Sequence, residues 1–152
     1  MYFIEHIKDK FKNQKLDIYV DMDGVVADYN ICDNPYNFKD KRPLYTNINT
    51  IKKLSELDNV NIYILSVCIK DTDILDKTNW LEKYCDFIKK TNINILSKES
   101  IVNTPTHEMK CNFLNNLKTN NTIILIDDDN NVLHYVRNNS KITVYQDSSL
   151  LD

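Results

Sequence analysis

Acidic side chains gather where apolar runs of this sequence end. Asp21 and Asp23 follow one such run, Ser66 follows a second, and the acids 127–129 follow a third. If these runs are parallel strands of one sheet, their carboxyl ends meet at the same edge, which is where ligands bind in open α/β sheets. Chance seldom places so many acids at one edge, so we expect a binding or catalytic site there.

Carboxylates packed this closely repel one another and take up protons unless a cation lies among them. Mg²⁺ suits a site that offers a few carboxylates, water and a substrate phosphate. Such an ion would also remove the repulsion that keeps a carboxylate nucleophile away from a phosphate dianion. Attack of Asp on phosphorus, which forms an aspartyl-phosphate, is established chemistry. The acidic pattern therefore indicates magnesium-dependent phosphoryl transfer.

Gly24 is the only glycine of the chain and directly follows Asp23. A glycine kept at one position alone indicates a tight backbone turn or a close approach to a ligand. The pattern Asp21-x-Asp23-Gly24 also occurs in calcium-binding loops, but those loops need a bidentate Glu at their end, and no such Glu follows here. A strand-end turn with solvated acids is the other alternative, and the second acidic run counts against it.

The elements that must position these residues are short strands alternating with helices. Runs rich in β-branched and aromatic residues predict strands at 18–20, 61–65, 93–96, 122–126 and 141–145. Helical spacing of apolar residues predicts helices at 2–11, 49–57, 73–89, 106–117 and 129–138. The expected fold class is therefore α/β, a doubly wound, Rossmann-like parallel sheet of about five strands with helices on both faces.

Length and composition set further limits. The chain has 152 residues and a formal net charge of −3, so we expect one domain over 1–152 and no nonspecific binding of duplex nucleic acid. No secretory signal and no apolar stretch of membrane-spanning length is visible, which predicts a soluble, cytoplasmic protein. The four cysteines lack metal-ligand spacing and are expected to be reduced thiols, mostly in the core: Cys32, Cys68, Cys85 and Cys111.

Three segments together resemble a known family. The string Val20-Asp21-Met22-Asp23-Gly24-Val25-Val26-Ala27-Asp28-Tyr29, then Ile64-Leu65-Ser66, then Leu125-Ile126-Asp127-Asp128, is similar to the haloacid dehalogenase (HAD) superfamily of phosphatases. Within it the sequence looks most like the 5′(3′)-deoxyribonucleotidases, over about residues 16 to 136. The first motif is highly specific, whereas the Ser and Asp-Asp motifs are individually weak but occur in the required order.

The resemblance implies a role for each matching residue. Asp21 would be the nucleophile and a Mg²⁺ ligand, and Asp23 the general acid and base, with its backbone carbonyl also on the metal. Ser66 would donate a hydrogen bond to the transferring phosphoryl group. Asp127 and Asp128 would supply the remaining carboxylate to the ion, and the sequence leaves open which of them binds it directly.

The superfamily also uses a lysine to balance the phosphate charge. Lys110, near the start of the helix before the Asp127 strand, is the first choice, and Lys98, just past the third strand, is the rival. The substrate would be a small phosphate ester, expected to be a nucleotide, bound beside Gly24, Ser66 and Val67. Tyr29 occupies the place where the deoxyribonucleotidases carry an aromatic residue next to the nucleobase.

The expected cap is short. Residues of about 25–45 fit neither helix nor strand periodicity and read as a small insertion after the first strand. Tyr36, Phe38 and Tyr45 lie in or beside it and could either stack on a base or close the insertion over the core. A small cap leaves an open site, so sugar phosphates, polynucleotide ends and phosphoproteins stay open as substrates. An inactive binding module and transfer to an acceptor other than water also stay open, as does the oligomeric state.

Overall fold

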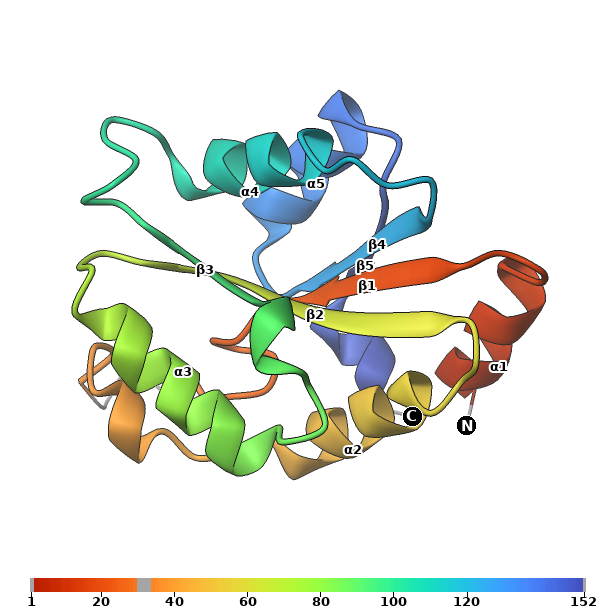
Figure 1. Cartoon of the computed structure of the whole chain (residues 1–152), viewed down its shortest axis with the longest axis horizontal. Coiled ribbons are helices and arrows are strands. Elements are labelled where there is room, and N and C mark those ends of the chain that lie inside the picture. The colour runs from red at the N-terminus through yellow and green to blue at the C-terminus, as the bar shows by residue number, and fades with distance from the viewer. Residues whose placement is uncertain (1, 30–33, 152) are drawn as a thin grey trace.

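A parallel sheet of five strands, in the order β3-β2-β1-β4-β5, forms the centre of the molecule in this computed structural model (Figure 1). The structure describes residues 2–29 and 34–151. The strands are β1 (Leu16–Val20), β2 (Val60–Cys68), β3 (Ile93–Ser97), β4 (Thr122–Asp127) and β5 (Thr143–Gln146). The chain builds outward from β1 to β3 and then crosses back to β4 on the other side of β1. This order confirms the predicted doubly wound class and makes β1 and β4 the neighbours at its switch point.

Helices cover both faces of the sheet (Figure 1). They are α1 (Tyr2–Lys10), α2 (Tyr45–Ser55), α3 (Asp73–Tyr84), α4 (Thr106–Asn115) and α5 (Asn130–Asn139). Three short 3₁₀ turns complete the described structure: η1 (Phe38–Asp40), η2 (Lys90–Asn92) and η3 (Asp147–Leu150). Figure 1 shows α4 and α5 on one side of the sheet and α1, α2 and α3 on the other.

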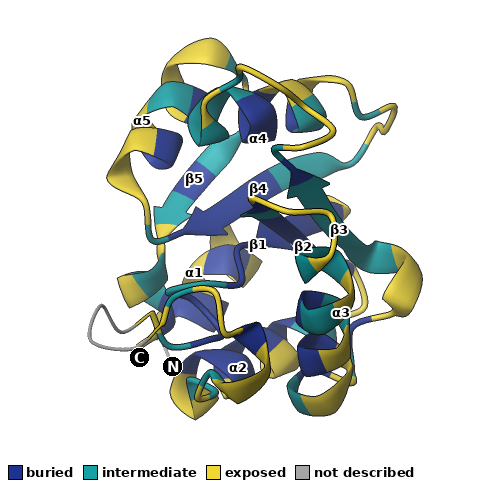
Figure 2. Ribbon diagram, turned by 90° about the vertical axis from the view of Figure 1, so that its left-hand side faces the viewer, coloured by how far each residue is buried: buried dark blue, intermediate teal, exposed yellow. Residues whose placement is uncertain are grey.

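Alternate residues of the central strand enter two different cores. Ile18 and Val20 of β1 belong to the larger core, which includes residues of α1, α2 and α3. Tyr19 points to the opposite side and packs with Leu65, Leu125 and the apolar residues of α4 and α5. All five residues of β1 are buried for this reason, and Figure 2 shows the same burial along the middle of the sheet. A strand covered on both faces reads as a continuous apolar run, which is why the sequence pattern found it.

Helix ends differ from the expected ends where tertiary contacts replace the helical pattern. The helix expected at 73–89 ends at Tyr84, yet Ile88 beyond it is buried. Ile88 fits the helical spacing of apolar residues although it packs outside the helix, so the sequence pattern predicted a helix that is too long. The helix expected at 49–57 begins earlier, at Tyr45, where the buried Asn47 donates to the Val25 carbonyl at 2.8 Å.

One strand end moves a predicted site residue. The strand expected at 61–65 continues to Cys68, so Ser66 lies inside β2 rather than after it. Ser66 pairs in register with Ile95 of β3, and Cys68 pairs with Ser97. Ser66 still lies at the carboxyl edge of the sheet, because it is two register positions beyond Ile64, which pairs with Val20 at the end of β1.

The segment between β1 and α2 folds back on the sheet and packs on α3. Its first turn is closed by three backbone N–H groups, from Val25, Val26 and Ala27, that donate to the Met22 carbonyl. Further along, the Trp80 indole of α3 donates to the Lys41 carbonyl at 2.9 Å. These bonds hold the insertion against α3, next to the carboxyl edge of the sheet (Figure 1).

Three of the four cysteines lie in the described part of the chain, and all three are free and buried, as predicted: Cys68, Cys85 and Cys111. Cys32 lies outside the described residues. Within 2–29 and 34–151, no helix has the length and apolar character needed to cross a membrane.

Replacement of Asn47 by Ala tests the anchor between α2 and the turn after β1. The substitution leaves the buried Val25 carbonyl without its donor, which costs about 1–3 kcal/mol and should lower Tm by several degrees. The control is Asn49→Ala, which changes an exposed residue of the same helix. Equal Tm values for the two variants in thermal unfolding would contradict the anchoring role.

Candidate active site

The candidate site begins where β1 and β4 end side by side. Val20 of β1 lies opposite Ile126 of β4 in register, and the Asp21 N–H donates to the Ile126 carbonyl at 3.0 Å. The carboxylates of Asp21, Asp127 and Asp128 follow, each offering an oxygen within 4.8 Å of the other two. The structure thus brings together three of the four acids that the sequence predicted as metal ligands.

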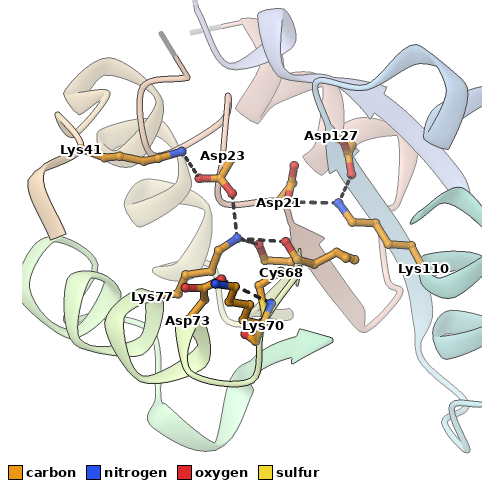
Figure 3. Close-up of polar contacts among 11 residues, drawn as sticks. Asp21, Asp23, Lys41, Cys68, Lys70, Asp73, Lys77, Lys110 and Asp127 are labelled. Carbon is orange, nitrogen blue, oxygen red and sulfur yellow. Dashed lines mark hydrogen bonds and ion pairs between the residues drawn. The ribbon is translucent and has the colours of Figure 1, made fainter. Parts of the chain in front are cut away.

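Lys110 of α4 lies among these acids and is buried, as are Asp21 and Asp127, whereas Asp128 is partly exposed. Its Nζ is 3.0 Å from an Asp21 oxygen and 2.6 Å from an Asp127 oxygen (Figure 3). Burial alone would lower the pKa of Lys110, but the two carboxylates raise it above its ordinary value. Lys110 is therefore an ammonium that joins the ends of β1 and β4.

One ammonium does not balance three carboxylates. Burial raises the pKa of Asp21 well above its ordinary value, and Asp127 raises it further against the opposing effect of Lys110. Burial and the neighbouring Asp127 raise the pKa of Asp128 to about 6. A further cation would favour their ionised forms, and an oxygen-only cluster of carboxylates fits the donor preference of Mg²⁺. Asp21, Asp127 and Asp128 are the residues that would hold such an ion.

Gly24 makes room for this cluster. Its φ of +81° lies in the left-handed region, and a Cβ atom there would lie 2.0 Å from Oδ2 of Asp128. The tight turn predicted at this glycine is confirmed, and the group that approaches it closely is the Asp128 side chain of the protein itself. Any other residue at position 24 would displace Asp128.

Asp23 has a different environment from Asp21, only two residues away. Its two oxygens accept from Lys41 and from Lys77, each at 2.7 Å (Figure 3). Burial would raise the pKa of Asp23, but the two lysines lower it below its ordinary value. The side chain of Asp23 is absent from the three-acid cluster, so a metal contact through its backbone carbonyl remains a prediction.

Lys77 is the site residue that the sequence reasoning missed. It lies in α3, has no exposed side-chain surface and also donates to Ser66 and to the Val67 carbonyl. A signal for it existed, because Lys77 precedes the buried Trp80 and Leu81 by three and four residues. A lysine within the apolar stripe of a helix must find a buried partner.

A pocket of about 470 Å³ opens over the acids. Its lining includes the predicted residues Asp21, Asp23, Tyr29, Val67, Lys98, Lys110, Asp127 and Asp128, together with Tyr36 and Phe38. Gly24 and Ser66, also predicted to bind the substrate, are not part of the lining, and Ser66 is buried. Tyr29 is 53% exposed, and Lys41 Nζ lies 4.9 Å from the centre of its ring. Tyr45 is exposed and does not line this pocket. Among the described residues, Lys98 forms no ion pair with the acids, in contrast to Lys110.

Comparison with known proteins places this geometry in a known fold. No protein-family model matches the chain, and no curated protein sequence matches it. A chain in the structure of the Pnkp1/Rnl/Hen1 RNA repair complex is similar at 18% identity with a TM-score of 0.69, over 89% of this chain and 43% of that one. The HAD domain of effector protein Lem4 from Legionella pneumophila is similar at 13% identity with a TM-score of 0.55, over 87% of this chain and 85% of that one.

These likenesses support the HAD fold that the sequence motifs suggested. The finer likeness to the deoxyribonucleotidases stays a prediction, and this chain spans less than half the length of the first similar chain. Identities this low carry information on the fold alone, so activity has to be argued from the site.

Magnesium should stabilise the folded protein through the three acids. The folded protein keeps a proton on Asp128 up to about pH 6, above the 3.8 of an ordinary Asp, so without a cation this favourable contribution is lost as pH rises through that window. Mg²⁺ at ten times its Kd should add about 1.4 kcal/mol, or a few degrees in Tm. The increase should be larger at about pH 7.5 than at about pH 5, because protons compete for the same oxygens.

Two variants locate that effect. Asp128→Asn should lose most of the increase in Tm with Mg²⁺. Asp129→Asn should keep it, because Asp129 is an exposed neighbour that caps α5 through the Asn131 N–H, and Asn caps equally well. A Mg²⁺ effect that is equal in both variants would place the ion elsewhere.

Gly24→Ala should abolish magnesium stabilisation as well as lower Tm. The added methyl group would displace Asp128, and the left-handed backbone costs a residue with a Cβ about 1–2 kcal/mol. Asn13→Ala is the matched control, since Asn13 is exposed, also has a positive φ (64°) and lies outside the pocket over the acids. Both variants should lose stability, but only Gly24→Ala should lose the shift in Tm with Mg²⁺; a normal shift in that variant would contradict the packing argument.

Proposed function

We propose that this chain is a HAD-like phosphatase domain, a magnesium-dependent phosphomonoesterase that transfers the phosphoryl group to Asp21. The observation that carries the proposal is the cluster of Asp21, Asp127 and Asp128 bridged by the buried Lys110 at the carboxyl edge of a HAD-type sheet. A nucleophilic carboxylate, a fixed ammonium and a set of magnesium ligands meet there within one pocket.

Asp21 is oriented for attack by its neighbours. Lys110 binds one of its carboxylate oxygens, so the other oxygen is left for phosphorus. Mg²⁺ held by Asp21, Asp127 and Asp128 would supply the charge neutralisation that lets a phosphate dianion approach a carboxylate. Lys110 adds a positive charge that is already in place and needs no rearrangement during the reaction.

Two displacements complete the reaction. In the first, a bond forms between an Asp21 oxygen and phosphorus while the ester P–O bond breaks, and the leaving oxygen takes a proton from Asp23. In the second, Asp23 takes a proton from water as that water attacks phosphorus, which releases inorganic phosphate and restores Asp21. The first displacement needs a proton on Asp23, which it would take up from solvent beforehand. Lys41 and Lys77 favour the ionised form of Asp23, which is the form that accepts the proton from water in the second displacement.

The proposed substrate is a nucleoside 5′-monophosphate. Tyr29 and Tyr36 are half-exposed at the pocket over the acids, and an aromatic face can stack on a base for about 1–3 kcal/mol. A phosphorylated polynucleotide end is the second candidate. It is favoured by the short insertion between β1 and α2 and by the likeness to a chain of an RNA repair complex.

Asp21→Asn tests the proposed nucleophile. The amide cannot attack phosphorus, so kcat for p-nitrophenyl phosphate should fall at least about 1,000-fold, with the far-ultraviolet circular dichroism unchanged. EDTA should remove the activity of the unmodified protein and Mg²⁺ should restore it. Residual activity of Asp21→Asn within about tenfold of the unmodified protein would rule out the covalent route.

A substrate panel decides between the two proposed classes. Release of phosphate should be measured from deoxyribonucleoside and ribonucleoside 5′-monophosphates, sugar phosphates and oligonucleotides with phosphorylated ends. Nucleotides should exceed sugar phosphates in kcat/KM by at least about tenfold if a base stacks on Tyr29, and Tyr29→Ala should remove that preference. Equal values for nucleotides and sugar phosphates would reject the nucleotidase proposal while leaving the phosphatase proposal intact.

A further inference from the structure

Lys77 connects three parts of the site from inside the protein. Its Nζ lies 2.7 Å from Oδ2 of Asp23, 2.9 Å from Oγ of Ser66 and 3.1 Å from the carbonyl oxygen of Val67. These acceptors belong to the turn after β1 and to the end of β2, whereas Lys77 comes from α3. Figure 3 shows its side chain reaching from that helix towards Asp23.

The ammonium group of Lys77 has no donor left for a substrate. It carries three N–H groups, and the three acceptors account for all of them. The ring of Phe38 lies 4.6 Å from Nζ, and the side chain is completely buried. Lys77 therefore acts on other residues of the site rather than on a phosphate directly, unlike Lys110, which lines the pocket.

The contact with Ser66 fixes the direction of a proton. Ser66 is buried, and its Oγ accepts from Lys77. A hydroxyl group has one hydrogen and two lone pairs, so an oxygen that already accepts from Lys77 turns its own hydrogen towards a different atom. The oxygens of a phosphate dianion accept hydrogen bonds. The contact with Lys77 therefore favours Ser66 as a donor to them.

Neutralising Asp23 does not by itself explain Lys77. Lys41 binds the other oxygen of Asp23 at the same distance of 2.7 Å, and its side chain is only 7% exposed. Asp23 thus has one buried ammonium partner without Lys77. What Lys77 adds beyond Lys41 is the pair of contacts to Ser66 and to the Val67 carbonyl.

We infer that Lys77 is a positioning residue that aims the Ser66 hydroxyl at the transferring phosphoryl group, while holding the Asp23 carboxylate beside it. The inference rests on the proposed phosphatase function. Lys77 is not a catalytic residue in this account, because it acts through Ser66 and Asp23 and touches no reacting atom.

A double-mutant cycle tests the coupling between Lys77 and Ser66. Ser66→Ala is measured in three backgrounds: the unmodified protein, Lys77→Met and Lys41→Met. A donor to a phosphoryl oxygen is worth about 100-fold in kcat, so Ser66→Ala should cost that much in the unmodified protein. In Lys77→Met the hydroxyl has lost its orienting donor, and the same substitution should cost less than about threefold.

Lys41→Met is the matched control. It removes the other ammonium from Asp23 and is expected to lower kcat. In the described part of the chain, however, Lys41 forms no hydrogen bond with Ser66, whose Oγ accepts from Lys77. The cost of Ser66→Ala in that background should stay near 100-fold. If Lys77 only balances the charge of Asp23, Ser66→Ala should lower kcat by the same factor in the Lys77→Met and Lys41→Met backgrounds.

The outcomes separate the inference from the function on which it rests. An unmodified protein without magnesium-dependent phosphate release contradicts the proposed function. Normal turnover of the unmodified protein, combined with a full cost of Ser66→Ala in Lys77→Met, overturns the inference alone. The inference is also overturned if the unmodified protein is active and Ser66→Ala leaves its kcat unchanged, because the Ser66 hydroxyl would then make no hydrogen bond that matters to the phosphoryl group.

A second measurement uses only the unmodified protein, so it does not depend on the folding of a variant. In a crystal structure of the unmodified protein with Mg²⁺ and beryllofluoride, Ser66 Oγ should remain bonded to Lys77 Nζ while its hydroxyl contacts a fluorine at about 2.7 Å. Lys77 itself should stay away from the mimic. A Ser66 side chain rotated away from Lys77, or Lys77 Nζ bound directly to beryllofluoride, would overturn the inference.

Discussion

Repulsion among three carboxylates at the ends of two adjacent strands is the constraint on which this structure depends. Asp21, Asp127 and Asp128 offer oxygens within 4.8 Å of one another, and Lys110 supplies a single ammonium between two of them. Burial, and after it the charge of the neighbouring Asp127, raises the pKa values of Asp21 and Asp128. A divalent cation would balance the negative charge of these carboxylates. The same ion would also allow a carboxylate to attack a phosphate.

The two acids of the Asp21-x-Asp23 motif belong to two separate charge systems. Asp21 faces Lys110 and the acids of β4, and its pKa is raised. Asp23 faces Lys41 and Lys77, and its pKa is lowered. The chain thus gives neighbouring carboxylates different proton affinities by surrounding them from opposite sides of the sheet edge (Figure 3).

The sequence predicted what depends on local pattern. Strands buried on both faces read as apolar runs, so the five strands and the acids beyond β1 and β4 were found. Lys77 was missed because its partners lie 11 and 54 positions away, and only the folded chain brings them to α3. The end of α3 was also missed, since Ile88 is buried by tertiary packing outside any helix. The contact between Gly24 and Asp128 likewise joins two distant segments that only the sheet order brings together.

Anomalous diffraction from a crystal soaked with Mn²⁺ would show whether a divalent cation binds between the ends of β1 and β4, because Mn²⁺ favours the same carboxylate and water oxygens as Mg²⁺. We expect a single strong peak among Asp21, Asp127 and Asp128, at about 2.2 Å from their nearest oxygens, with Lys110 still bound to Asp21. An absence of any peak at these acids, with the three side chains turned away from one another, would contradict this expectation.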